Sequence, residues 1–142
     1  MSKNITPDPY PWKKEYELNN ELFDTQTKKF LEIINAMKEL VATGIEEKGI
    51  SEVFYQLVHY FERYMLREEM YLTDLSYDDL DKHKISHKEF MDRIIIFREE
   101  FEKGKKDFNL DMYNYLEKWF DDHMMVDDRT AVDFISERRK DK

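Results

Sequence analysis

Proline and glycine are confined to a few positions in this chain, and their placement limits what it can fold into. All three prolines lie within the first eleven of the 142 residues, at Pro7, Pro9 and Pro11. The three glycines are Gly44, Gly49 and Gly104. Proline and glycine are the residues that most often interrupt regular structure. The sequence therefore predicts an all-α protein, and its length favours a single domain covering residues 1–142.

Four segments with helical periodicity lie between three predicted connections at residues 43–49, 73–79 and 104–109. In each segment apolar residues recur at intervals of three and four, which places them on one helix face. The second and fourth stripes include Phe61, Tyr64 and Val126. Because long helices with short connections pack as antiparallel neighbours, we expect an up-down-up-down four-helix bundle. An extended N-terminal arm at residues 1–11 and a frayed tail at about 136–142 complete the prediction.

Composition excludes several classes of function. The chain has 32 acidic and 23 basic residues, a net charge of −9, which argues against nucleic-acid binding. It has no cysteine, which excludes disulfides, iron–sulfur clusters and thiol nucleophiles. The longest apolar run is residues 94–97, far short of the roughly 20 residues of a membrane helix. With no apolar signal-peptide core at the N-terminus, we expect a cytoplasmic protein without a membrane partner.

Four polar residues interrupt the apolar stripes. Glu68 occupies an apolar register position, His83 and His87 lie four residues apart in register with Phe90, and His123 follows Trp119 by one turn. An unpaired buried carboxylate is costly, and facing helices of a bundle commonly build metal sites in the core. We therefore interpret Glu68, His83, His87 and His123 as ligands of a divalent cation. The alternative is a buried His–Glu hydrogen-bond network.

A second carboxylate is expected near the end of the fourth helix, at Asp127 or Asp128. Asp127 lies four residues after His123, almost on the same face of an ideal helix, whereas Asp128 lies about 140° around it. Spacing alone favours Asp127. Asp128 can point inward only where the helix widens locally, as in the single π-helical turns found at functional sites. His59 lies off the stripe of its helix and is expected to face solvent.

Around these residues the chain resembles the bacterial hemerythrin-like proteins. The resemblance runs from Trp12 to about Ala131, and its motifs occur in order and at the spacing of the family. They are Trp12, residues 24–27 (DTQT) and 33–35 (IIN), residues 60–70 (YFERYMLREEM), residues 83–90 (HKISHKEF) and residues 119–128 (WFDDHMMVDD).

The resemblance implies a site with two irons bridged by a Glu, an Asp and an oxygen atom, one iron bound by three histidines and the other by two. Mapped by motif, the three-histidine iron falls at His83, His87 and His123, and the bridging carboxylates fall at Glu68 and Asp128. Here the motif overrules the spacing preference for Asp127.

Two departures fall on the other, O2-binding iron of the family. Its two histidines correspond to Thr27 and Tyr64 in this chain. Thr27 is a poor metal ligand, and its alternative role is a small core residue. Tyr64 can bind a ferric ion as phenolate, although its ordinary pKa is about 10. Its alternative role is a core tyrosine that forms a hydrogen bond with Glu68 or water.

Three functional hypotheses follow. In the first, one metal, with Fe favoured over Zn or Mn, is held by three histidines and two carboxylates. A small ligand such as O2 or NO takes the sixth position, for sensing, storage or redox protection. In the second, Tyr64 completes a di-iron site with O2 or peroxide chemistry. In the third, the site is vestigial and the bundle binds a protein partner. No catalytic residue is assigned, so we expect a binding protein rather than an enzyme.

Overall fold

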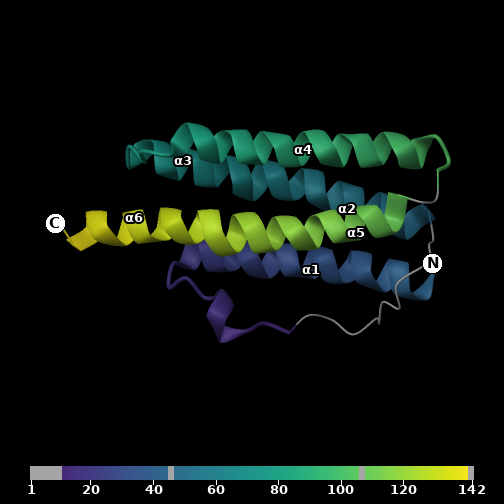
Figure 1. Ribbon diagram of the computed structural model, residues 1–142, viewed down its shortest axis with the longest axis horizontal. Helices are drawn as coiled ribbons and strands as arrows, with labels where there is room; N and C mark the ends of the chain where they lie inside the picture. Colours follow the sequence, from purple (N-terminus) through teal and green to yellow (C-terminus); the bar gives the residue numbers. More distant parts are fainter. Residues whose placement is uncertain (1–10, 45–46, 106–107, 141–142) are drawn as a thin grey trace.

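Four long helices lie side by side along the length of the molecule (Figure 1). The computed structural model describes residues 11–44, 47–105 and 108–140. Two of the helices are uninterrupted, and each of the other two contains a π-helical segment. The elements are η1 (Lys14–Tyr16, a 3-10 turn), α1 (Glu21–Thr43), α2 (Glu47–Tyr60), π-helical η2 (Phe61–Met65), α3 (Leu66–Asp74), α4 (Leu80–Glu102), α5 (Phe108–Trp119), π-helical η3 (Phe120–Asp127) and α6 (Asp128–Lys140).

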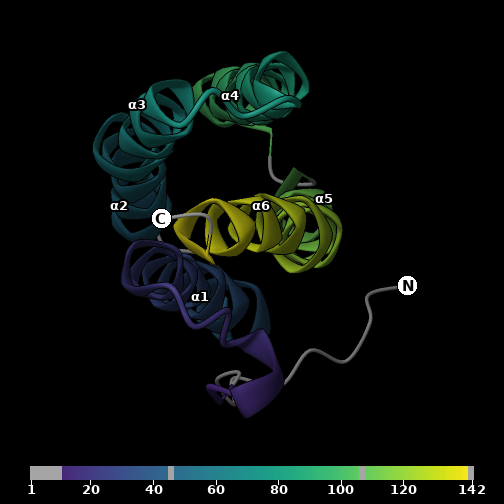
Figure 2. The ribbon, with the colours of Figure 1, turned by 90° about the vertical axis from the view of Figure 1, so that its left-hand side faces the viewer.

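The chain direction reverses from each long helix to the next, as the colour gradient along α1, α2–α3, α4 and α5–α6 shows (Figure 1). Seen from the end, the helices surround a common interior (Figure 2). The predicted all-α, antiparallel four-helix bundle is therefore confirmed. Among the described residues there is no strand, and none of the helices is long and apolar enough to cross a membrane.

Local sequence sets the limits of α1. The side chain of Asn20 accepts a hydrogen bond from the Phe23 amide at 3.2 Å, satisfying one of the free amides of the first turn. At the other end Gly44 has a φ of 111°, in the region that glycine adopts without a steric penalty. The Gly44 amide donates to Leu40 O at 3.1 Å and closes the last turn. The first connection was predicted at residues 43–49 and is shorter in the structure, because α1 includes Thr43 and α2 already begins at Glu47.

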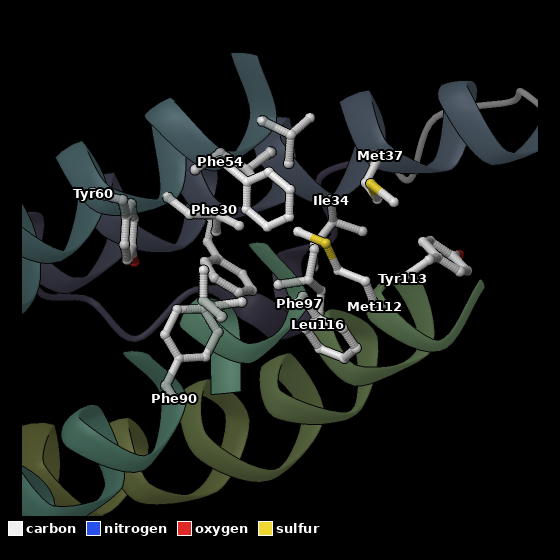
Figure 3. Packing of buried hydrophobic residues seen from close by; sticks show 14 of the residues in the cluster. Phe30, Ile34, Met37, Phe54, Tyr60, Phe90, Phe97, Met112, Tyr113 and Leu116 are labelled. Atoms are coloured by element: carbon white, nitrogen blue, oxygen red, sulfur yellow. The ribbon is translucent and has the colours of Figure 1, made fainter. Parts of the chain in front are cut away.

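Aromatic side chains fill the interior between the helices (Figure 3). The rings of Phe30, Phe90 and Trp119, from three different helices, pack with centroids 4.4–5.8 Å apart. Such tilted aromatic contacts add to the stabilisation that comes from burying the rings. Trp12 packs against this core from the N-terminal side, and the Lys28 ammonium lies 4.9 Å from the centroid of its ring. The core therefore ties together α1, α4 and α5.

The two π-helical segments change which residues face inward. Around η2 the buried residues are Tyr60, which immediately precedes the segment, and Met65, its last residue. Phe61 and Tyr64, which the sequence predicted to face inward, are partly exposed. In the fourth helix the predicted inward residue Val126 is 56% exposed. A π-helical turn holds about one residue more than an α-turn, so a stripe drawn with α-helical spacing loses register after it. The inward position predicted for Val126 is therefore wrong, whereas Phe61 and Tyr64 still pack against the core but are only partly buried.

The predicted arm lies almost entirely outside the described residues, which begin at residue 11. At the other end α6 continues to Lys140, although the sequence predicts fraying from about residue 136. Arg138 contributes to order there, because its guanidinium donates to Leu75 O at 2.9 Å and lies over the Phe134 ring. This contact joins α6 to the end of α3.

Candidate metal centre

Three of the four long helices bring five polar side chains to one point in the core. Glu68 comes from α3, His83 and His87 from the first half of α4, and His123 and Asp128 from the junction of η3 with α6. All five are buried, with 1–4% of each residue exposed. The elements that carry them lie toward the same end of the bundle (Figure 1). The four residues expected from the interrupted stripes thus meet in space, and Asp128 joins them.

The ring nitrogens and carboxylate oxygens point toward a common centre. His87 Nε2 lies 3.1 Å from His123 Nε2 and 3.4 Å from Glu68 Oε1. Asp128 Oδ1 lies 3.2 Å from His123 Nε2 and 3.3 Å from His83 Nε2. His83 Nε2 also contacts Glu68 Oε1. One ligand atom from each of Glu68, His83, His87 and His123 lies within 4.8 Å of all the others.

This arrangement fits a metal ion better than a hydrogen-bond network. Neighbouring ligand atoms of a six-coordinate ion with bonds of about 2.1 Å lie about 3.0 Å apart, close to the separations between these atoms. In a network without metal, His87 Nε2 and His123 Nε2, which lie 3.1 Å apart, can pair only if one of the two nitrogens carries a proton. Asp128 Oδ1 is buried and has no hydrogen bond of acceptable geometry among the described residues. A bound cation would give this buried oxygen a partner.

The imidazoles and carboxylates of the cluster shift one another's pKa values. Burial lowers the pKa of His83, but the close contacts of its ring with the Asp128 and Glu68 carboxylates outweigh burial and raise that pKa to about 10. For His123 burial is likewise outweighed, chiefly by the charge of Asp128, and its pKa rises to about 9. Burial raises the pKa of Asp128, but the nearby His123 and His83 lower it overall. The two carboxylates thus favour positive charge at this point, and a divalent cation supplies it without protons.

The outer nitrogens of two histidines have partners of their own. His87 Nδ1 donates to Glu69 Oε2 at 2.7 Å. His123 Nδ1 donates to Asp127 Oδ2 at 3.2 Å and lies 2.8 Å from Ser86 Oγ. Such hydrogen bonds fix the ring orientation and leave Nε2 of each ring as the ligand atom. Glu69 and Ser86 were not identified from the sequence, although each lies next to a predicted ligand.

The choice between the two aspartates depends on the π-helical segment. Residues 120–127 are π-helical, and the wider turn brings Asp128 inward, so that 3% of its side chain is exposed against 42% for Asp127. Ideal helical spacing predicted that Asp127 enters the cluster, and this prediction is wrong, because Asp128 enters it instead. Asp127 instead accepts a hydrogen bond from the far side of His123.

We expect Asp128→Ala to abolish tight metal binding and Asp127→Ala to weaken it by about 10–100-fold. The first removes an oxygen from the cluster, whereas the second removes a hydrogen bond that orients His123, and loss of such outer contacts has that magnitude. Titration with Co(II), followed by the visible spectrum of the bound ion, measures both. If Asp127→Ala loses the ion while Asp128→Ala keeps parental affinity, the roles assigned to the two aspartates are reversed.

Thr27 and Tyr64, the two residues predicted to replace histidines of the family, have contacts outside the cluster. Thr27 is fully buried, and its hydroxyl donates to Phe23 O within α1 at 2.9 Å. The ring of Tyr64 packs at 5.1 Å against Tyr60, with the Arg63 guanidinium 5.9 Å from its centroid. Tyr60, which the sequence did not single out, is buried, and its hydroxyl donates to Gln26 O at 3.1 Å. Burial first, and then the charges of Glu68 and Asp128, raise the Tyr60 pKa.

Comparison with known proteins agrees with the fold and with the cluster. Residues 18–135 match the family model described as the hemerythrin HHE cation binding domain. A bacteriohemerythrin of Clostridium acetobutylicum is 27% identical over 128 residues, which cover 87% of this chain and 99% of that protein. A bacteriohemerythrin of Pseudomonas paraeruginosa is 30% identical over 135 residues, 92% of this chain and 87% of that protein. A myohemerythrin of Theromyzon tessulatum is 30% identical over 88 residues, 62% and 68% of the two chains.

A four-helix bundle with a buried cluster of histidines and carboxylates is typical of cation-binding helical proteins. With the match over residues 18–135, the chain belongs to the hemerythrin family.

Proposed function

We propose that this protein binds one iron ion through His83, His87, His123, Glu68 and Asp128. The convergence of these five side chains on one buried point carries the proposal. Three neutral imidazoles and two carboxylates suit iron, with manganese and zinc as the alternatives for such a set. The two negative charges neutralise a divalent ion, so a buried site of this composition carries no net charge.

The residues at positions 27 and 64 favour a single ion. The family uses two histidines there for its other iron, and this chain has Thr27 and Tyr64. The Thr27 hydroxyl is engaged by the backbone of its own helix. The Tyr64 ring, partly exposed, packs against Tyr60 and Arg63. Neither arrangement presents an imidazole. A second ion would therefore have to share Glu68 and Asp128 with the first and find its remaining ligands in water or a phenol.

With five protein ligands, a six-coordinate iron keeps one position for a small ligand such as O2 or NO. An iron bound at this site would supply a one-electron redox couple and an open coordination position. Both properties suit sensing, storage or redox protection. Glu69, Asp127 and Ser86 hold the rings of His87 and His123 so that Nε2 of each faces the ion. The partly buried Trp119 ring stacks on His123 with centroids 4.3 Å apart and shields that side of His123 from water.

Substitution of one ligand tests this proposal directly. We expect His87→Ala to lose tightly bound metal, because the substitution removes one of the five proposed ligands and alanine offers no donor atom in its place. His59→Ala is the matched control: it removes an imidazole that is exposed and stacked on Tyr55. Metal content after purification from iron-supplemented cells measures both. Equal metal content in the two variants would contradict the ligand assignment.

A further inference from the structure

A cavity of about 190 Å³ adjoins the buried metal centre on the side of His83. It lies where the turn before α4 meets η3 and α6, and its lining includes Tyr77, Asp79, His83, Asp127 and Thr130. His83 therefore has two faces: its Nε2 points to Glu68 and Asp128, while the residue forms part of the cavity wall. The cavity is a space between solvent and the proposed ligand set.

The ligand set itself is closed, since its members are 1–4% exposed. An ion cannot reach it without passing between side chains. Asp127 links the cavity to the interior, because its side chain is 42% exposed and also accepts a hydrogen bond from His123 Nδ1. Asp128 Oδ1, buried and without a hydrogen bond of acceptable geometry, lies 3.3 Å from His83 Nε2 on the inner side. Carboxylates thus lie on both sides of the His83 ring.

Size and charge indicate what the cavity accepts. A cavity of about 190 Å³ has room for several water molecules, so it can admit a divalent cation together with its hydration shell. Asp79 and Asp127 supply negative charge to the lining, and Lys82 is its one cation among the described residues. Burial and the charges of Asp79 and Asp127 raise the Tyr77 pKa to about 12, in agreement with an acidic lining. Acidic clefts concentrate cations and speed their association.

We infer that this cavity is the route by which a divalent cation reaches the metal centre, with Asp79 capturing the hydrated ion and Asp127 passing it toward His83 and His123. The inference rests on the proposed function, since it requires that the five residues bind a metal. It adds a role for two carboxylates outside the ligand set and assigns the uptake of the ion to the face formed by the start of α4 and by η3.

The rate of metal uptake tests this route, and the fluorescence of Trp119 can report when the metal arrives. Trp119 lies parallel to the His123 ring, with 4.3 Å between centroids and 15° between planes, so binding at the cluster changes its fluorescence. Trp12 is the other tryptophan of the chain, and Trp12→Phe removes its signal. Metal-free Trp12→Phe protein is mixed with Co(II) in a stopped-flow instrument, and the end-point stoichiometry is measured on the same samples.

We expect Asp79→Asn to lower the Co(II) association rate about threefold to tenfold at low ionic strength, with the end-point stoichiometry unchanged. The difference should shrink as salt screens the carboxylate. Asp79 precedes α4 without a side-chain capping bond, so the amide should not disturb the helix. Asp81→Asn is the matched control, since it makes the same charge change in the first turn of α4 away from the cavity lining.

A second pair of variants fills space instead of removing charge. Thr130→Phe, which places a ring in the cavity, should slow uptake more than tenfold. Ser51→Phe fills a separate cavity, of about 260 Å³ between α2 and α4, and should leave uptake unchanged. Equal rates for Asp79→Asn and Asp81→Asn, or parental uptake by Thr130→Phe, would overturn the route. Absence of Co(II) binding by the parent at the end point would instead overturn the proposed function, and the route with it.

Discussion

Removal of the metal is expected to lower the thermal unfolding midpoint of the protein by about 10 °C or more. A ligand that binds only the folded state stabilises it by about 4 kcal/mol when its concentration is 1,000 times Kd, and for a chain of this size each kcal/mol corresponds to about 2–4 °C. The physical reason is the buried cluster: without the ion, three imidazoles and two carboxylates share a closed site. Circular dichroism with and without a chelator measures the midpoint.

The His87→Ala variant serves as the control for this experiment. Because it lacks the ion, its midpoint should not respond to the chelator, whereas His59→Ala should respond as the parent does. Metal analysis after chelation confirms that the ion has been removed. An unchanged midpoint in the metal-free parent would show that the cluster is stable as a hydrogen-bond network and that folding does not depend on metal.

The largest change in metal content is expected from introducing histidines at positions 27 and 64, where the resemblance to the family implies them. We expect Thr27→His combined with Tyr64→His to raise the iron content from about one to about two ions per chain and to produce visible absorption that appears on exposure to air. The new imidazoles come from α1 and η2, which face the same interior as Glu68. Iron analysis and the visible spectrum, recorded on the same sample, measure the gain.

Packing sets the cost of this change. Thr27 is fully buried, so a larger ring there disturbs the core by about 1–3 kcal/mol before any metal binds. Each single variant is therefore the control: neither completes the pair, and each should stay near one ion. If the double variant folds, as judged by circular dichroism, and still holds one ion, the two missing histidines do not explain the stoichiometry.

Periodicity was sufficient for most of the fold and for four of the five residues of the cluster. The His83–His87 pair could be read directly, because α4 is a regular α-helix and residues four apart share a face. Glu68 and His123 stood out because each is a polar residue in a buried register. The connections followed from Gly44 and the polar run before α4, since these are local signals.

The fifth residue could not be found from spacing, because the π-helical segment 120–127 changes the register between His123 and Asp128. Periodicity assumes an α-helix throughout, so it did not predict that Val126 is exposed, or that Tyr60 is fully buried while Phe61 is only partly buried. Resemblance to the family identified Asp128, because a motif preserves the spacing of a distorted helix. The roles of Glu69 and Ser86 depend on contacts between helices, which sequence spacing does not report.

The metal-to-protein ratio tests the central proposal most directly. Protein is produced in iron-supplemented medium, freed of loosely bound metal by gel filtration, and analysed for metals by mass spectrometry against a protein concentration from amino-acid analysis. A value near one iron per chain is the predicted result, with His87→Ala near zero. A value near two would contradict the single-ion site and favour a second ion held with the help of Tyr64, and a value near zero would contradict metal binding itself.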